Sequence, residues 1–397
     1  MNEVYLNAMG VDCALGQGAQ AVRERLFAAP GVFASPLTLT DRYSPGRPLH
    51  LGLLPQEPAP LGDDVPVGLR SRNNALLRAT LAQLRAPVEA AIARYGSHRI
   101  AVVVGISSPG VVEGEVAGQC LVQGKGWPTG YHLTQQEMGS ACAFVARELA
   151  LCGPSYAIST ACSSGAKAFA SAARLLRAGL ADAVIAGGVD ALCRLTVAGF
   201  SALDSVSAAP CNPLSRNRCG INIGEGAGLF LLSREPGPVR LAGWGESSDA
   251  HHMSAPDPGG RGALDAMRQA VQRAGVAPQA IDYVNLHGTA TPLNDAMESL
   301  AVAALCGPDV AVSSTKPLTG HTLAAAGAVE AAIAWLTLVD NPQGRLPPHC
   351  WDGQRDPALA PLRVARIGET LGRAPHYVLS NSFAFGGSNA SLLLAAG

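Results

Sequence analysis

Short runs of apolar residues alternate with longer stretches of helical periodicity along this chain. The apolar runs predict strands at residues 99–104, 155–160, 183–186, 281–286 and 309–313. Apolar residues that recur every three or four positions predict helices at residues 73–95, 166–180, 264–274 and 323–339. Because strands and helices alternate instead of occurring in separate blocks, the pattern predicts an α/β fold.

The order of these elements suggests two similar halves. In each half a strand leads through a turn of small residues into an alanine-rich helix, at residues 159–165 and again at residues 313–321. A charged, proline-containing stretch at residues 234–238 is the expected boundary, so the halves would span residues 1–237 and 238–397. Two further stretches rich in proline, at residues 45–66 and 340–359, are expected to be surface loops.

The helix predicted at residues 323–339 is almost entirely apolar, which raises the question of a membrane span. Glu330 lies at its centre and the stretch is short for a bilayer crossing, so we expect a helix buried on all sides by protein. The first residues carry an acid, Glu3, where a secretion signal needs bases, and no long apolar stretch follows. We therefore expect a cytoplasmic protein.

Composition narrows the choice of partners. The chain has 397 residues, of which 48% are hydrophobic and 15% charged, and its formal net charge is −1. No overall field therefore attracts nucleic acid or an anionic membrane, and a charged partner must be met by a local patch. The ten cysteines form no short-spaced pairs, so a disulfide framework is not expected.

Cys162 is the first candidate for chemistry. It lies in Thr160-Ala161-Cys162-Ser163-Ser164-Gly165, where a strand is expected to turn into a helix. Amide dipoles at a helix N-terminus favour a thiolate, which is a nucleophile, and the small neighbours allow a substrate carbonyl to approach the backbone. The Cys162 amide could then stabilise an oxyanion. The alternative is that Cys162 is one more buried cysteine.

Two histidines follow strands in the second half. His287 lies in His287-Gly288-Thr289-Ala290-Thr291, with Asn294 and Asp295 close behind, and His321 ends Lys316-Pro317-Leu318-Thr319-Gly320-His321. Either histidine alone is more often a structural residue. Two histidines and a cysteine, all at strand exits, could instead converge where parallel strands end, which is where α/β sheets place their sites.

Other residues could support such a site. Lys316 and Glu330 are charged residues in apolar surroundings, so we expect them to pair; the alternative is that Lys316 caps a surface turn. The stretch Asn381-Ser382-Phe383-Ala384-Phe385-Gly386-Gly387 could be a flexible lid that supplies a backbone amide. Metal binding is disfavoured because no short-spaced ligand pair is present. For the glycine-rich residues 224–228, close backbone packing is preferred to a phosphate cradle.

Together these segments resemble the β-ketoacyl-acyl-carrier-protein synthases of the elongating type I/II kind, which are condensing enzymes of the thiolase fold. The resemblance runs nearly end to end and rests on the four motifs around Cys162, His287, His321 and Phe385 in their order along the chain. It implies a thiolase-like five-layer αβαβα fold of two pseudo-duplicated halves. It also implies a dimer and a site without metal or organic cofactor.

The resemblance also implies roles for named residues. Cys162 would accept an acyl group from a carrier-protein thioester. His287 and His321 would bind the malonyl thioester oxygen and stabilise the enolate that forms as carbon dioxide leaves. The product would be a β-ketoacyl carrier protein in fatty-acid or polyketide elongation. The amides of Cys162 and Phe385 would form a second oxyanion hole, Phe385 would gate the acyl pocket, and Lys316 and Glu330 would support the site. Substrate-binding positions would be Thr289, Thr291, Phe383 and Gly386.

Three departures from the family pattern favour a specialised synthase, such as those of polyketide or aryl-polyene pathways. Residues 214–221 lack two acids that relatives usually carry, and residues 105–110 replace a more glycine-rich loop near the acyl pocket. Ala384 replaces a usual glycine, which should stiffen the gate.

Three rival activities and the partners complete these expectations. A non-catalytic chain-length partner typically lacks the nucleophilic cysteine, a thiolase would carry a second cysteine near the C-terminus, and a Cys-His hydrolase would want an Asn or Asp that orients a histidine. The expected partner is an acyl carrier protein, which is acidic as a class, and its docking patch would be Arg70, Arg72, Arg216 and Arg218. A homodimer is expected, with a heterodimer of related subunits as the alternative.

Overall fold

The computed structural model describes residues 3–29 and 35–397. The described part of the first half contributes to a large sheet the strands β1 (Tyr5–Cys13), β5 (Ile100–Gly105), β6 (Ser155–Ile158), β7 (Ala183–Asp190) and β8 (Gly226–Ser233), and a short strand that pairs with β1. In space they lie in the order β6-β5-β7-β8-β1. The first three strands run parallel, whereas β8 is antiparallel to both of its neighbours.

The second half repeats this arrangement. Its strands are β9 (Val239–Ser248), β10 (Tyr283–Asn285), β11 (Ala311–Ser313), β13 (Tyr377–Ala384) and β14 (Ser388–Ala396), with β12 (Arg363–Val364) added at the edge. They lie in the order β11-β10-β13-β14-β9, with the same pattern of parallel and antiparallel pairs. The two halves are therefore pseudo-duplicates, joined by a short β1–β9 pairing. A boundary between residues 237 and 238 stays a prediction.

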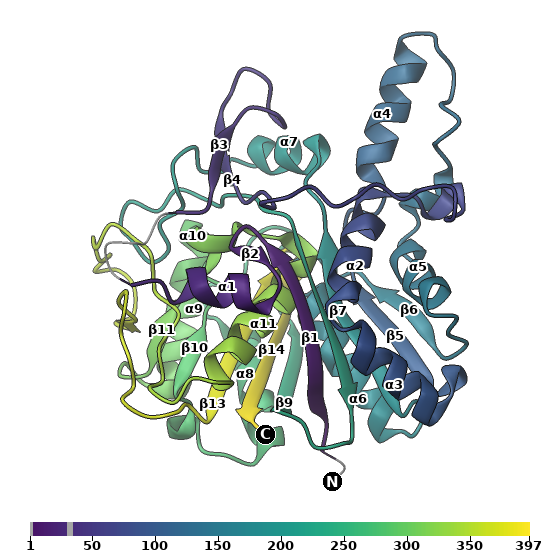
Figure 1. Cartoon of the computed structure of the whole chain (residues 1–397). Helices are drawn as coiled ribbons and strands as arrows, with labels where there is room; N and C mark the ends of the chain where they lie inside the picture. The colour runs from purple at the N-terminus through teal and green to yellow at the C-terminus, as the bar shows by residue number, and fades with distance from the viewer. Residues whose placement is uncertain (1–2, 30–34) are drawn as a thin grey trace.

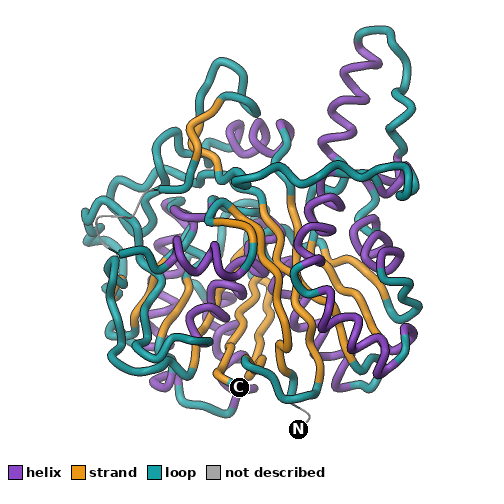
Figure 2. The backbone as a smooth tube through the Cα atoms, viewed as in Figure 1, coloured by secondary structure: helices purple, strands orange, loops and turns teal. Residues whose placement is uncertain are grey.

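Helices form three layers around the two half-sheets. On the outer face of the first half lie α2 (Arg72–Ala82), α3 (Arg85–Tyr95) and α5 (Ser140–Glu148); α8 (Arg261–Ala274) and α9 (Pro292–Cys306) cover the second. Between the halves lie α6 (Ser164–Arg177) and α11 (Ala326–Leu338), which contact each other and strands of both halves. Figures 1 and 2 show the strands running through the molecule between helices. This is the expected five-layer αβαβα arrangement.

Shorter elements lie at the ends of the strands. They are the helices α1 (Ala19–Leu26), α4 (Val111–Val122), α7 (Arg194–Ala202) and α10 (Lys316–Thr319), and the strands β2 (Gly16–Gln17), β3 (Thr38–Thr40) and β4 (Leu49–Leu51). Six 3₁₀ turns complete the secondary structure: η1 (Val67–Leu69), η2 (Ser97–Arg99), η3 (Leu133–Gln136), η4 (Pro278–Ala280), η5 (Leu323–Ala325) and η6 (Phe385–Gly387). Figure 1 shows α4 projecting from the body of the molecule.

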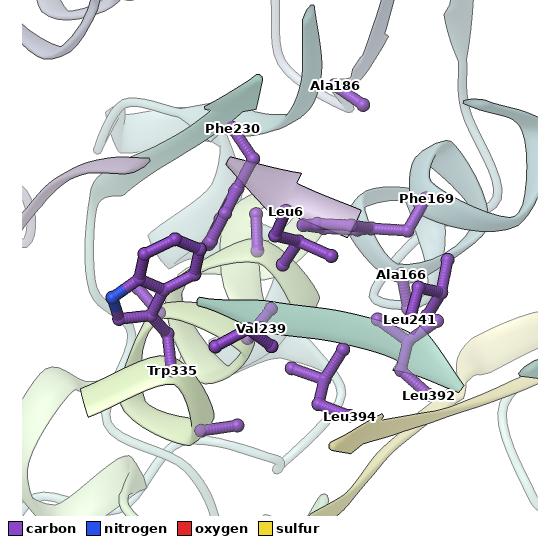
Figure 3. Packing of buried hydrophobic residues seen from close by; sticks show 14 of the residues in the cluster. Leu6, Ala166, Phe169, Ala186, Phe230, Val239, Leu241, Trp335, Leu392 and Leu394 are labelled. Carbon is purple, nitrogen blue, oxygen red and sulfur yellow. The ribbon is translucent and has the colours of Figure 1, made fainter. Parts of the chain in front are cut away.

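The core between the half-sheets is built from small side chains with a few large ones. Every residue of α11 is buried, as predicted for the stretch at 323–339. Figure 3 shows Phe169 of α6, Phe230 of β8 and Trp335 of α11 in this cluster, among leucines, valines and alanines. The rings of Phe169 and Phe230 pack edge to face at 5.0 Å. Small residues elsewhere let the central helices lie close to both half-sheets.

Two predicted elements need correction. The helix predicted at 73–95 is two helices, α2 and α3, because Pro87 can occupy only a first turn and has no N–H to continue a helix from α2. At the break, the Gln83 carboxamide accepts a hydrogen bond from the Val11 N–H (2.9 Å) and donates to Asp12. The second correction concerns the loop predicted at 45–66, which contains β4, paired with β3.

Candidate active site

The turn around Cys162 connects β6 to α6. Ala161 has a φ of +51°, a strained conformation for a residue with a side chain. Two hydroxyls hold the turn: Ser163 Oγ donates to the Thr160 carbonyl (2.8 Å) and Ser164 Oγ donates to the Ala161 carbonyl (2.6 Å). The strained turn brings Cys162, only 5% exposed, to the floor of a cavity.

Glycines allow the neighbouring segments to approach this turn closely. A Cβ on Gly105, at the end of β5, would lie 2.5 Å from the Gly165 nitrogen, and a Cβ on Gly165 would lie 2.7 Å from the Ala324 carbonyl oxygen. Because no side chain fits at either position, the end of β5, the start of α6 and η5 stack backbone against backbone. The turn that carries Cys162 is thus fixed between the two halves of the molecule.

His287 follows β10 and is held through its backbone. The amides of His287 and Gly288 donate to the two carboxylate oxygens of Glu298 on α9, at 2.8 and 2.7 Å. The His287 Nδ1 lies 3.4 Å from the Lys316 Nζ. An ammonium can only donate, so Nδ1 is the acceptor and the ring proton of neutral His287 lies on Nε2.

His321 is held in the same tautomer by a different donor. Its backbone N–H donates to the Asn222 carbonyl (2.6 Å), and the Leu323 N–H donates to its Nδ1 (3.3 Å). The proton of neutral His321 therefore also lies on Nε2. Both histidines are nearly fully buried. The backbone of His321 also pairs with that of Ile223 in an isolated β-bridge.

The three residues converge as the sequence predicted. The Cys162 sulfur and one ring nitrogen of each histidine lie within 4.8 Å of one another. The two imidazoles meet edge to face, with centroids 5.2 Å apart. Two imidazoles that carry protons on Nε2 can donate two hydrogen bonds to one oxygen beside the sulfur.

The same geometry bears on metal binding. A histidine that ligates a metal through one nitrogen usually donates the proton on its other nitrogen to an acceptor. Here the Nδ1 atoms of His287 and His321 face donors, Lys316 and the Leu323 N–H, so each Nε2 carries a proton in place of a free lone pair. The three residues are therefore poor zinc ligands and good hydrogen-bond donors.

Lys316 and Glu330 form the pair predicted from the sequence. The Lys316 Nζ lies 2.5 Å from Glu330 Oε1, and both side chains are almost completely buried. The second oxygen, Glu330 Oε2, has no hydrogen-bond partner. The Lys316 ammonium lies beside His287, and its positive charge disfavours a second proton on the imidazole.

Burial dominates the protonation of the site. Burial and Lys316 hold the pKa of His287 and of His321 well below the usual range, so both rings are neutral at pH 7. Burial raises the pKa of the Cys162 thiol to about 12, although Lys316 opposes this. The expectation that the helix N-terminus would favour a thiolate is therefore wrong for the resting site, which holds a neutral thiol beside neutral imidazoles.

The cavity above these residues measures about 280 Å³. Among the residues that line it are Thr289, Thr291 and Phe383, which were predicted to bind substrate, and Phe385, which was predicted to gate the acyl pocket. The two threonine hydroxyls lie 2.9 Å apart. Gly386, also predicted, does not line the cavity; it is exposed, and its N–H donates to the Met253 carbonyl (2.7 Å). The lining residues that were not predicted include Cys219 and Phe200, whose ring centroid lies 5.8 Å from that of Phe385.

Comparison with known proteins identifies the family. The model of the β-ketoacyl synthase N-terminal domain matches residues 76–236, and that of the C-terminal domain matches residues 239–350. A chain of a ketosynthase in complex with its chain length factor, from Xenorhabdus doucetiae, is 42% identical with a TM-score of 0.92. That match covers 100% of this chain and 98% of the other. The chain belongs to the β-ketoacyl synthase family.

Other members are also similar. The ishigamide ketosynthase/chain length factor is 26% identical with a TM-score of 0.86, over 100% of this chain and 99% of the other. The 3-oxoacyl-[acyl-carrier-protein] synthase 2 of Rhizobium meliloti is 40% identical over 264 residues, which is 61% of this chain and 61% of that relative. The matched region thus spans less than two thirds of this curated relative. No helix within residues 3–29 and 35–397 is long and apolar enough to cross a membrane.

Two of the departures from the family pattern have a structural explanation. Ala384 has φ −106° and ψ 155°, ordinary strand geometry, so alanine fits without strain at the end of β13. The positive φ of the gate turn falls instead on Gly386 (+83°) and Gly387 (+72°). In the other departure, Ser107 and Ser108 of the 105–110 loop both bind Asp190.

Two of the four arginines predicted as a carrier-protein patch are largely covered by other parts of the chain. Arg70 and Arg72 line a cavity beside α4, whereas Arg216 and Arg218 bind the segment at residues 352–356. Arg72 pairs with the buried Glu225 (2.7 Å) and Arg218 with Asp356 (2.5 Å), and both side chains are largely covered. Arg216 is exposed, and Arg70 is half-buried and paired with exposed Asp63. Arg72 and Arg218 are thus less accessible than a docking patch requires, and the patch as a whole stays a prediction.

Three buried acids escaped the sequence analysis. Glu298 holds the His287 turn, Asp190 at the end of β7 holds the 105–110 loop, and Glu225 anchors Arg72. Each had a signal: an acid in a stretch that is otherwise small or apolar has to find partners in the core. Glycines beside Glu225 confirm the packing interpretation of residues 224–228, since a Cβ on Gly224 would lie 2.5 Å from the Thr319 carbonyl oxygen.

Proposed function

We propose that this chain catalyses the decarboxylative condensation of an acyl group on Cys162 with a malonyl thioester on an acyl carrier protein. The supporting observation is the convergence of one thiol and two neutral imidazoles, within 4.8 Å, at the floor of a cavity. The substrates would enter on the phosphopantetheine arm of the carrier, and the reaction would use no metal and no organic cofactor.

The first half-reaction transfers the acyl group to Cys162. The neutral thiol must lose its proton as sulfur attacks the thioester carbonyl, and the leaving carrier sulfur can take up that proton, because both imidazoles already carry theirs on Nε2. The tetrahedral oxyanion would be stabilised by the backbone amides of Cys162 and Phe385. The carrier thiol then leaves with a proton, and the sulfur keeps the acyl group.

The second half-reaction uses both histidines as hydrogen-bond donors. The malonyl thioester oxygen would accept from the Nε2–H groups of His287 and His321, which stabilises the enolate as the carboxylate carbon leaves as carbon dioxide. The enolate carbon attacks the acyl thioester on Cys162, the carbon–sulfur bond breaks, and the β-ketoacyl group remains on the carrier. Burial and Lys316, which Glu330 holds in place, would keep the imidazoles neutral, and Thr289 and Thr291 would bind the pantetheine amides.

A direct assay tests this reaction. The chain is incubated with an acyl carrier protein bearing a short acyl group and with malonyl carrier protein, and the 3-oxoacyl carrier is detected by mass spectrometry. His287→Ala and His321→Ala should retain acylation of Cys162 and lose condensation by about 100-fold or more. Release of free acid in place of condensation would favour a hydrolase, and product from acetyl-CoA alone would favour a thiolase.

We propose further that the chain works as a dimer, formed with a second copy or with a related subunit. Support comes from the open edge of β6 and from exposed apolar side chains on and after the projecting α4: Val116, Leu121, Val122, Trp127, Leu133 and Met138. Two relatives are described as a ketosynthase with a chain length factor. Light scattering of the purified chain decides whether it pairs with itself. A cytoplasmic location and a specialised polyketide-type pathway stay predictions.

A further inference from the structure

Asp190 is a buried carboxylate with an unusually complete set of donors. It ends β7, next to β5, and is 0% exposed. Its Oδ1 accepts from the amides of Ser107 (3.1 Å) and Ser108 (2.9 Å) and from the Ser108 hydroxyl (2.8 Å). Its Oδ2 accepts from the Ser107 hydroxyl (2.5 Å) and from the Ala324 amide (2.8 Å). Burial raises the pKa of Asp190, and the three amides oppose this because they can only donate and so favour the carboxylate.

Four of these donors come from the first half of the chain, and the fifth comes from the second. The Ala324 amide belongs to η5, which begins two residues after His321. Two glycines of the first half leave space for η5. A Cβ on Gly165 would lie 2.7 Å from the Ala324 carbonyl oxygen, and a Cβ on Gly188 would lie 2.9 Å from it. Asp190 is therefore a polar link that holds the His321 segment against the half that carries Cys162.

The backbone next to this link sets the tautomer of His321. Leu323 has a φ of +52°, a conformation that is strained for a residue with a side chain and must be held by its surroundings. In that conformation the Leu323 N–H donates to His321 Nδ1 at 3.3 Å. The next amide, that of Ala324, is the one bound by Asp190. If this bond is lost, the strained turn can relax and withdraw the donor from His321.

We propose that Asp190 is a positioning residue that holds the Leu323–Ala324 backbone so that His321 keeps its proton on Nε2. This proposal rests on the proposed function, because it concerns the histidine that would bind the malonyl oxygen. It also assigns a role to Ser107 and Ser108, which supply both hydroxyl bonds and two amide bonds to the carboxylate.

Asp190→Asn tests the link with little change in volume. An asparagine can place its oxygen where Oδ1 accepts from the two serine amides, but its NH₂ group then faces the Ala324 amide, so that bond is lost. We expect condensation in single-turnover experiments on pre-acylated enzyme to slow by about 10- to 100-fold, as for loss of a hydrogen bond to a charged group. Acylation of Cys162, followed by intact mass, should change by less than about threefold, within the context-dependent spread of a single hydrogen bond.

A spectroscopic readout separates this role from general destabilisation. Histidine labelled with ¹⁵N should show an unprotonated Nδ1 for His321 in the wild type and a mixture of tautomers in Asp190→Asn, with the signal assigned by comparison with His321→Gln. The matched control is Asp12→Asn, a buried carboxylate at the end of β1 bound to Thr80 and Gln83, which should keep both the tautomer and the condensation rate.

Several outcomes would overturn the proposal. These are an Nδ1–H tautomer in the wild type, or a folded Asp190→Asn variant with the wild-type tautomer and condensation rate. If Asp190→Asn does not fold, Ser107→Ala removes the hydroxyl that donates to Oδ2 beside the Ala324 amide and should slow condensation by about two- to fivefold; no slowing overturns the proposal. A wild type that shows the expected tautomer but never condenses acyl groups would instead contradict the proposed function.

Discussion

Replacing Lys316 with methionine probes how the buried ion pair controls the two histidines. The Lys316 Nζ lies 2.5 Å from Glu330 Oε1 and 3.4 Å from His287 Nδ1, and all three side chains are buried. Methionine retains most of the apolar stem and removes the charge. The substitution therefore leaves Glu330 unpaired and removes the positive charge that keeps His287 neutral.

The structure sets the magnitude of both effects. A buried carboxylate without its partner destabilises a protein by about 3–5 kcal/mol. At an effective dielectric constant of about 20, the Lys316 charge at 3.4 Å repels an imidazolium by about 5 kcal/mol, and Glu330 offsets part of this. We therefore expect the pKa of His287 to rise by at least about one unit in Lys316→Met. Protonated His287 would add a positive charge to a site in which neutral imidazoles donate the hydrogen bonds. As the pH falls, activity should therefore be lost at a higher pH in Lys316→Met than in the wild type.

The assay combines pH profiles with unfolding. The acidic limb of kcat/KM for the malonyl substrate should move to higher pH by about one unit or more in Lys316→Met. The double variant Lys316→Met/Glu330→Leu removes the unpaired carboxylate as well, so it should regain most of the free energy of unfolding and keep the displaced limb. An acidic limb that stays in place, or a double variant as unstable as the single one, would refute the reasoning.

Three further predictions concern other parts of the molecule. Burial lowers the pKa of His349 to about 4, so its neutral form contributes stability above pH 6.5 that is lost as the pH falls toward 4. His349→Gln should reduce this loss by about 3 kcal/mol in urea unfolding at pH 7 and 4.5. Gly105→Ala places a Cβ 2.5 Å from the Gly165 nitrogen, and we expect a lower free energy of unfolding by about 2 kcal/mol or more together with slower acylation of Cys162; unchanged values would contradict this. Arg216→Glu should raise the KM for acyl carrier protein and leave kcat for a pantetheine thioester unchanged, whereas equal effects on both substrates would remove Arg216 from the docking surface.

The sequence predicted those parts of the fold whose signal is local. Strands of the parallel type, such as β5 and β7, are continuous apolar runs, and α11 is apolar on every face. The break between α2 and α3 also has a local signal, Pro87, but the helical periodicity on both sides of it led to the prediction of one helix. The long antiparallel strands β9 and β14 alternate less clearly, because helices cover one face and the core the other.

Site residues could be predicted where a reactive residue type lies close behind a predicted strand. They could not be predicted where a side chain depends on a partner that is distant in the sequence. Cys162 and His287 each come soon after a strand of a parallel set, and His321 comes after β11 and the short helix α10, so their convergence follows largely from topology. The partners of Arg72 and Arg218 could not be read from the sequence, because Glu225 and Asp356 lie more than a hundred residues away along the chain. The sequence motif around Cys162 shows the helix N-terminus, which favours a thiolate, but it does not show burial. Burial raises the pKa of the thiol, and the expectation of a thiolate was therefore wrong.

The central claim is that Cys162 carries the acyl group, and intact mass spectrometry tests it most directly. The protein is exposed to a panel of acyl-carrier thioesters, with Cys162→Ala treated in parallel as the control. We predict one acyl group on the wild-type chain, none on Cys162→Ala, and loss of the label with formation of 3-oxoacyl carrier when malonyl carrier protein is added. Label on both proteins, or on neither across the panel, would contradict the assignment of the nucleophile.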